Sequence, residues 1–290
     1  MGNWYGYFLV IASAALFGAS SVVVKFTYST GLAPIPVLIM QNTCGMILAW
    51  GWVIASGKSA KLPRPLVPRM AAQGVLGGFL TSILFYTALG QLGAALATLL
   101  LYTYPAFVVL YGVLFRNYTL GVSQKTALAM ALVGIIFCVD ILEAQVGRVA
   151  LWAVALALGS AVTNAFISIN GERLLAVCET PVVTAWALTF STATMYLAYQ
   201  PLWLLEANLS GQQMALVAGG AFLCNIPLML YFAGLKRIGA NISAIVSTVE
   251  IPFTLILAWL ILQETLNGYQ IVGGVLIMAS VIILYRQRIE

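Results

Sequence analysis

The chain has 290 residues, of which 62% are hydrophobic and 7% are charged, and it carries a net charge of +5. Soluble domains have about 25% charged residues, so this composition excludes a soluble fold and indicates an all-α integral membrane protein. The absence of histidine argues against a zinc site, a haem site or a Ser-His-Asp triad. The basic residues are spread over several loops, which argues against a nucleic-acid partner.

Apolar runs separated by short loops predict ten transmembrane helices. The first run is longer than a signal-peptide core and lacks a basic leader, so we expect it to be a retained helix. The predicted spans, in chain order, are 4–28, 34–55, 70–90, 94–115, 123–141, 149–170, 181–200, 213–234, 240–262 and 267–286.

Lysine and arginine are distributed unequally between the two sides of the predicted bundle. Eleven of them fall on one side, in the loops after spans 2, 4, 6 and 8 and at the C-terminus, whereas Lys25 and Arg148 fall on the other. Because cytoplasmic loops are enriched in Lys and Arg, we expect both termini to be cytoplasmic, in a multi-pass protein of the inner membrane.

The two halves of the sequence resemble each other at an offset of 146 residues. A-L-G-Q-L-G-A at 88–94 matches G-L-K-R-I-G-A at 234–240, and Gln124 matches Gln270 at the same offset. Pro105 corresponds to Pro252 within one residue. Several matches at one offset predict an internal repeat.

With five spans in each half, the second half would enter the membrane from the opposite side. We therefore predict two inverted-topology five-helix repeats, 1–145 and 146–290. Secondary transporters often have this arrangement, with the substrate site near the midplane between the halves.

Several motifs carry a resemblance to a known family. G-L-K-R-I-G-A leads into a helix with E-I-P, then Q-E-T-L and Y-Q-I-V-G-G-V-L-I. The first half has A-L-G-Q-L-G-A, Y-T-Y-P-A and N-Y-T-L. The chain thereby resembles the EamA-type drug/metabolite transporters over essentially its whole length. Among these it is similar to the YddG-like amino-acid exporters.

The resemblance implies ten helices in two inverted halves and the movement of small metabolites, often outward. One position departs from the pattern. The family often has Glu shortly after the fourth span, but this chain has Arg116 there, where the second half has Glu264. Glu264 is therefore expected to be a residue of the helix end and not one of a symmetric functional pair.

Glu250 lies within the apolar run 240–262 and is followed two residues later by Pro252. A carboxyl in hydrocarbon costs about 2.5–3.5 kcal/mol on insertion scales, so we expect it to face protein or water. It could take up and release a proton during transport, or it could remain protonated and hydrogen-bonded to backbone groups freed by the proline.

Two polar stripes occur at matching depths in the two halves. Residues spaced by four and then three lie on one helical face, and hydroxyls on such a face can bind solute or join helices. The candidate substrate-binding residues on these stripes are Thr98, Tyr102, Pro105, Ser243, Ser247 and Glu250. Further candidates within other spans are Ser82, Phe85, Tyr86, Asn164, Ser168 and Asn225.

The function expected from these features is secondary transport by alternating access around a central cavity. The chain has no Walker motif or carboxylate cluster, so direct use of ATP, a metal or another cofactor is not expected. The expected cargo is amino acids, aromatic or neutral, and the direction is export by a monomer in lipid. The alternatives are a multidrug exporter of lipophilic cations and a lipid-carrier flippase. A membrane enzyme is disfavoured because catalytic clusters are absent.

Overall fold

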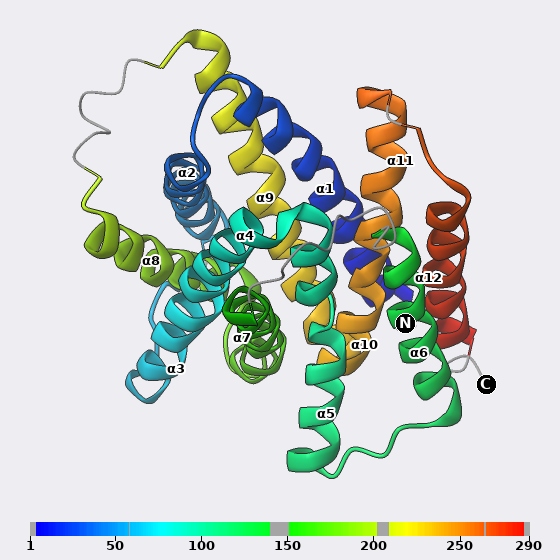
Figure 1. Cartoon of the computed structure of the whole chain (residues 1–290). Coiled ribbons are helices and arrows are strands. Elements are labelled where there is room, and N and C mark those ends of the chain that lie inside the picture. Colours follow the sequence, from blue (N-terminus) through cyan, green and yellow to red (C-terminus); the bar gives the residue numbers. More distant parts are fainter. Residues whose placement is uncertain (1–3, 58, 140–150, 202–208, 264, 287–290) are drawn as a thin grey trace.

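The computed structural model describes residues 4–57, 59–139, 151–201, 209–263 and 265–286, and every regular element in these ranges is a helix (Figure 1). The elements of the first half are α1 (Trp4–Ser29), α2 (Pro34–Ala55), η1 (Arg64–Leu66), α3 (Val67–Ala72), the π-helical segment η2 (Gln73–Leu80), α4 (Thr81–Leu101), α5 (Tyr104–Arg116) and α6 (Val122–Cys138). Those of the second half are α7 (Leu151–Leu175), α8 (Thr180–Tyr199), α9 (Gly211–Ile238), α10 (Ala240–Val246), η4 (Ser247–Val249), α11 (Glu250–Leu262) and α12 (Gly268–Arg286).

Within the described residues, eight helical segments are long and apolar enough to cross a membrane. They correspond to eight of the ten predicted spans. The predicted spans 123–141 and 181–200 correspond to the shorter apolar helix α6 and to α8, which are not among the eight. The count of ten therefore stays a prediction, whereas the all-helical membrane class is confirmed.

Two predicted spans are interrupted next to their prolines. The helix that enters span 94–115 ends at Leu101, and α5 begins at Tyr104, one residue before Pro105. In span 240–262 a 3-10 segment separates α10 from α11, two residues before Pro252. A proline removes one backbone hydrogen bond and clashes with the preceding turn, which accounts for both breaks. Pro227, in contrast, lies inside the continuous helix α9.

The offset of 146 residues extends to the bounds of the helices. Tyr104–Arg116 of α5 corresponds to Glu250–Leu262 of α11, and each helix is followed by a left-handed residue, Asn117 or Gln263. At the next helix start, the side chains of Gln124 and Gln270 both accept a hydrogen bond from the backbone N–H of the residue three positions earlier. This shared start explains the matched glutamines.

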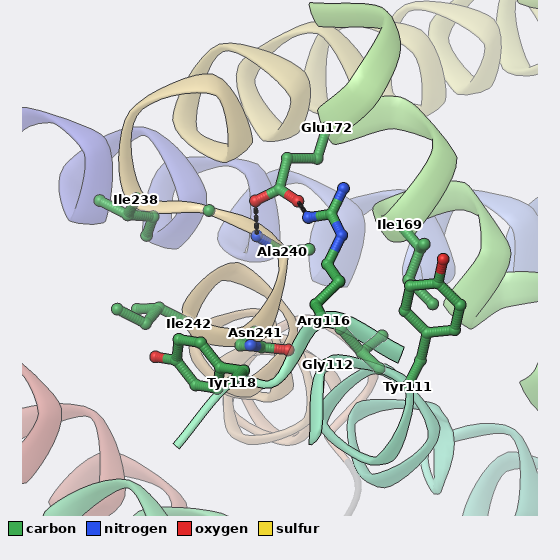
Figure 2. Close-up of a pocket in the computed structure, with 12 residues that line it drawn as sticks. Tyr111, Gly112, Arg116, Tyr118, Ile169, Glu172, Ile238, Ala240, Asn241 and Ile242 are labelled. Atoms are coloured by element: carbon green, nitrogen blue, oxygen red, sulfur yellow. Dashed lines mark hydrogen bonds and ion pairs between the residues drawn. The ribbon is translucent and has the colours of Figure 1, made fainter. Parts of the chain in front are cut away.

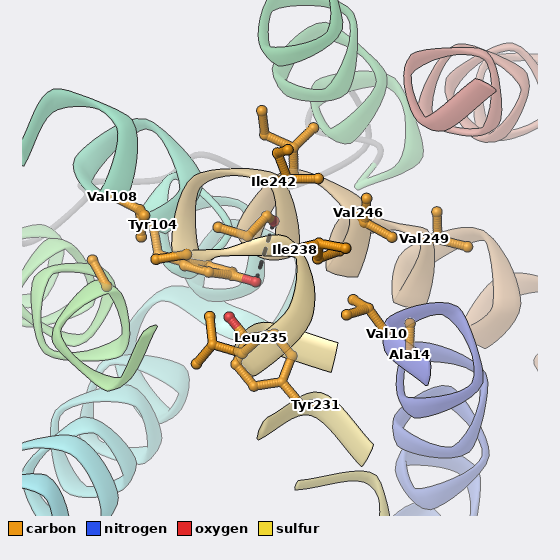
Figure 3. Close-up of a cluster of buried hydrophobic side chains, with 14 of the residues drawn as sticks. Val10, Ala14, Tyr104, Val108, Tyr231, Leu235, Ile238, Ile242, Val246 and Val249 are labelled. Carbon is orange, nitrogen blue, oxygen red and sulfur yellow. Dashed lines mark hydrogen bonds between the residues drawn. The ribbon is translucent and has the colours of Figure 1, made fainter. Parts of the chain in front are cut away.

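The main helix pairs join the two halves of the chain. In these pairs α1 packs along α9, α4 along α7, α2 along α8 and α6 along α12 (Figure 1). Small residues permit close approach: Ala153, Ala157, Ala161 and Ala165 form a buried face of α7. The apolar core surrounds α10, with Tyr104 and Val108 of α5 on one side and Val10 and Ala14 of α1 on the other (Figure 3). Of the predicted site residues, Tyr102 belongs to this core.

Candidate functional site

A cavity of about 520 Å³ lies between helices of both halves. Its walls come from α1, α2, η2, α4, α7, α8 and α9. Of the predicted site residues, Ser82, Phe85, Tyr86 and Asn225 line it. None of the described residues that line the cavity carries a formal charge. A volume between about 300 and 1,000 Å³ is typical of small-molecule sites.

The first-half wall presents aromatic and hydroxyl groups on one face of α4. Ser82, Phe85 and Tyr86 follow the helical spacing, which brings the three side chains to the same face. The Ser82 hydroxyl donates to the carbonyl of Gly78 at 2.9 Å, and the Phe85 and Tyr86 rings meet edge to face at 5.6 Å. Tyr86 also lies close to Tyr28 of α1, which lines the cavity as well. The wall is thus apolar with polar edges.

Amide side chains from α9 and η2 also line the cavity. Asn225 of α9 is buried, and its Nδ2 donates to the carbonyl of Ala221 at 2.6 Å. Gln73 donates to the carbonyl of Ile167 at 3.1 Å and accepts from Asn170 at 2.8 Å. These bonds satisfy groups that would otherwise be costly away from water.

The stripe residues meet one another at the two helix breaks and do not line the cavity. Tyr102, directly after α4, lies close to Glu250 at the start of α11, and the two side chains interact electrostatically. Tyr104 bonds to the hydroxyl of Ser247. The breaks of the two halves therefore face each other, through a tyrosine of one and a carboxyl or hydroxyl of the other.

The remaining stripe residues surround this contact. Pro105 is buried. Thr98 is half-buried and accepts the Tyr102 backbone N–H at 2.9 Å through its carbonyl. Ser243 is fully buried, and its hydroxyl has no hydrogen-bond partner among the described residues. Glu250 itself is half-buried.

Asn164 and Ser168 of α7 also lie apart from the cavity lining. The Ser168 hydroxyl bonds to the Tyr231 hydroxyl at 2.6 Å and so joins α7 to α9. Asn164 is half-buried four residues earlier on the same helix. Ser168 thus has a structural partner in this conformation.

Sequence reasoning missed several polar residues that line the cavity, among them Tyr28, Gln41, Asn42, Gln73, Thr81 and Ser191. The rule that an amide in hydrocarbon must find partners identifies Asn225 and applies equally to Gln41 and Gln73, which interrupt apolar runs of the sequence. The side chains of Gln41 and Ser191 each carry a buried polar atom that has no partner among the described residues.

A separate cluster closes the ends of α5, α7 and α9 (Figure 2). Arg116 forms an ion pair with Glu172, and the other carboxylate oxygen of Glu172 accepts the backbone N–H of Ala240 at 3.0 Å. Gly239, with a φ of +81°, lets the chain turn between α9 and α10. Arg116, which departs from the family pattern, thus pairs with an acid of α7. Glu264 and Arg148 lie outside the described residues.

We expect Glu172→Ala to lower the free energy of unfolding by about 1–2 kcal/mol, because the Ala240 N–H loses its acceptor and Arg116 its partner. Glu172→Gln keeps one acceptor oxygen and should lose about half as much. Thermal unfolding in detergent measures both. Lys236→Ala is the control, since its 3.9 Å contact with Glu179 is exposed and should contribute nothing measurable. Equal losses for the Ala and Gln variants would contradict the role of the N–H bond.

The fold and the cavity define a multi-pass membrane protein built for a small-molecule substrate in a lipid environment. The model of the EamA-like transporter family matches residues 4–139 and again 151–286. The chain belongs to the EamA-like transporter family, within the drug/metabolite transporter superfamily. It is a membrane transporter and not an enzyme.

Two curated relatives are similar over most of their length. "Uncharacterized transporter YcbK" of Bacillus subtilis (strain 168) is 22% identical over 284 residues, which cover 92% of this chain and 88% of that one. "Uncharacterized transporter sll1319" of Synechocystis sp. (strain ATCC 27184 / PCC 6803 / Kazusa) is 22% identical over 263 residues, covering 89% and 78%. Neither name specifies a substrate.

A solved structure described as "Crystal structure of protein" has the same fold. It superposes with a TM-score of 0.83 at 17% identity, over 98% of this chain and 97% of that chain. At this identity the likeness concerns the fold alone.

Proposed function

We propose that the chain is a secondary transporter that works by alternating access between two five-helix units, 1–145 and 146–290, inserted in opposite senses. The helix bounds that recur after 146 residues support this division, and so do the helix pairs between the halves. In an inverted repeat, α7 is the counterpart of α1, and α9 is the counterpart of α4. The contact between α1 and α9 therefore corresponds to the contact between α7 and α4, and both pairs pack together.

The proposed cargo is a small amphiphilic metabolite, with aromatic or neutral amino acids as the leading class and export as the direction. The observation that carries this proposal is the uncharged cavity of about 520 Å³, lined by amides, hydroxyls and aromatic rings. Sugar phosphates and nucleotides need cationic side chains to replace their water, and the described lining offers none. The likeness to YddG-like exporters agrees with this class.

The proposed moving parts are the segments interrupted near Pro105 and Pro252. Each break replaces regular α-helical hydrogen bonds by a turn or a 3-10 segment, which makes bending at that point less costly. Pro227 of α9 would serve as a third bending point. Glu250, at one of the breaks, is the proposed proton-carrying group. The protein would act as a monomer in the inner membrane with both termini cytoplasmic.

In purified protein reconstituted into vesicles, we expect neutral and aromatic amino acids to exchange across the membrane, and a proton gradient to change the rate. A panel of labelled solutes, measured with and without that gradient, tests this directly. Empty vesicles provide the background rate.

Two other outcomes would replace the proposal. Competition by lipophilic cations, with no effect of amino acids, would make the chain a multidrug exporter. Translocation of a labelled lipid carrier, with neither solute moved, would make it a flippase. One observation supports the flippase alternative. A groove between α2 and α9 is lined by Gly45 and Asn225, which pack against each other, and Asn225 also lines the cavity.

A further inference from the structure

We propose that the groove between α2 and α9 binds an anionic phospholipid, with the phosphate on Arg237 and one acyl chain along α9. The groove shares Asn225 with the cavity of about 520 Å³ but is otherwise lined by different residues. The inference is therefore independent of the proposed substrate. It starts from an apolar groove that has a cation without a carboxylate partner at one end.

The groove has a volume of about 620 Å³ and follows one face of α9. This helix lies between α1 and α2 and packs against both (Figure 1). Its lining residues recur every three or four positions, the spacing of one helical face: Phe222, Asn225, Ile226, Met229, Leu230, Ala233 and Arg237. Leu48 and Trp52 of α2 line the groove as well and are exposed. The lining is thus an apolar surface that is open to acyl chains.

The length of the groove corresponds to one leaflet of a bilayer. From Asn225 to Arg237 the helix rises about 18 Å, and the hydrocarbon of one leaflet is about 15 Å thick. At the end away from Arg237, α2 meets α9, because a Cβ on Gly45 would lie 2.0 Å from Nδ2 of Asn225. The lining on α2 begins at this contact. The groove therefore fits a chain of one leaflet that stays in that leaflet.

The other end of the groove has the residues of a membrane interface. Tyr5 lies in the first turn of α1 and Trp52 in the last turn of α2, and such rings are enriched at the level of lipid head groups. The guanidinium carbon of Arg237 is 4.9 Å from the centre of the Tyr5 ring, and Nη1 donates to the carbonyl of Ala233 at 3.2 Å. These contacts hold the guanidinium at the groove and leave most of its five N–H donors available.

The charge of Arg237 is not neutralised within the described part of the chain. Arg116 pairs with Glu172, and Lys236 lies 3.9 Å from Glu179, but no carboxylate of the described residues pairs with Arg237. A guanidinium binds two phosphate oxygens at once. Basic pockets between membrane helices on the side rich in Lys and Arg bind anionic head groups, and Arg237 belongs to that side. These features favour an anionic phospholipid over a zwitterionic one.

A second groove provides an internal comparison. It lies between α11 and α12, has a volume of about 540 Å³, and is lined by apolar residues and Gln270, with no charged residue among its described lining. This groove should accept acyl chains without selecting a head group. A preference for anionic lipid is therefore expected from the groove that contains Arg237.

Native mass spectrometry of the full chain in detergent tests the head group. We expect phosphatidylglycerol to bind about fivefold or more tightly than phosphatidylcholine with the same acyl chains, the gain from one basic residue near an anionic lipid. Arg237→Gln should abolish this preference and leave phosphatidylcholine unchanged. Lys236→Gln is the control, because it removes the same charge one position along α9 but outside the groove lining. It should keep the preference.

A second pair of variants tests the acyl chain. Ala233→Leu fills the groove next to Arg237 and retains the charge. Displacing even one CH₂ group of the chain should weaken the binding of both lipids about fourfold. Ala215→Leu is the control, since this position of α9 is exposed and lies outside the lining, and it should bind as the wild type does. Both replacements introduce a good helix former, so the variants should fold.

Three results would overturn the site. The first is a wild type without a preference for phosphatidylglycerol. The second is a preference that Arg237→Gln and Lys236→Gln reduce equally, because attraction by net charge would then explain it. The third is unchanged binding in Ala233→Leu. Glycerol phosphate, which has the phosphate without acyl chains, should not displace the lipid, and displacement would make the site one for small anions instead.

Discussion

The Glu250→Gln variant is expected to fold normally and to transport at a rate that no longer changes with pH. Glu250 is half-buried at the first residue of α11, directly after the 3-10 break, and its side chain meets the hydroxyl of Tyr102. A single titrating carboxyl changes a rate by at most about tenfold per pH unit, and an amide of the same shape removes that dependence. Transport in proteoliposomes over about three pH units measures it.

The first half has Tyr104 at the position that corresponds to Glu250, so no second carboxyl would take over in the variant. Glu172→Gln serves as the control, because Glu172 belongs to the Arg116 ion pair at the helix ends, and its variant should keep the dependence on pH. A Glu250→Gln protein whose rate follows pH like the wild type would leave Glu250 with a structural role at the break.

Replacing Gly273 by alanine is expected to cause the largest loss of stability among single-methyl changes in α12. A Cβ at Gly273 would lie 2.5 Å from the carbonyl oxygen of Gly134 and 2.7 Å from the backbone nitrogen of Cys138 in α6. Backbone atoms cannot turn aside as side chains do, so α6 and α12 would have to separate. Overpacking of this kind costs about 1–3 kcal/mol.

The adjacent glycine provides a matched control. A Cβ at Gly274 would meet Pro252 at an ordinary 3.5 Å, and alanine there gains helix propensity of up to about 1 kcal/mol. Thermal unfolding in detergent should therefore place Gly273→Ala below the wild type and Gly274→Ala at or above it. If the order were reversed, the close contact between α6 and α12 would not exist in solution.

The sequence predicted helix positions well because hydrocarbon length and backbone hydrogen bonding leave few alternatives. The predicted span 34–55 coincides with α2, and the span 267–286 with α12 within one residue. Helix ends that extend beyond the apolar span were predicted less accurately. The span predicted to end at residue 170 continues to Leu175, and this extension carries Glu172, the acid that pairs with Arg116.

The candidate site was predicted less completely. Ser82, Phe85 and Tyr86, proposed as polar or aromatic positions within an apolar span, line the cavity. The same spacing cannot tell which stripe faces the cavity and which faces a partner helix, because that depends on the helix pairs. The stripe with Glu250 therefore proved to contact Tyr102 at the breaks. Gln41 was missed because it is a single amide in the apolar run 34–55, with no other predicted site residue in that span.

The π-helical segment Gln73–Leu80 directly precedes the cavity wall formed by α4. Its i→i+5 bonds place more residues in each turn than an α-helix does, so α4 begins at a different angle around the axis than an uninterrupted α-helix would give. A π-helical segment can lose its extra residue by becoming an α-helix, and this loss would leave the direction of Phe85 and Tyr86 in α4 nearly unchanged. A single-codon deletion in Gln73–Leu80 is thus a change that this membrane span can absorb while the lining residues of α4 keep their direction.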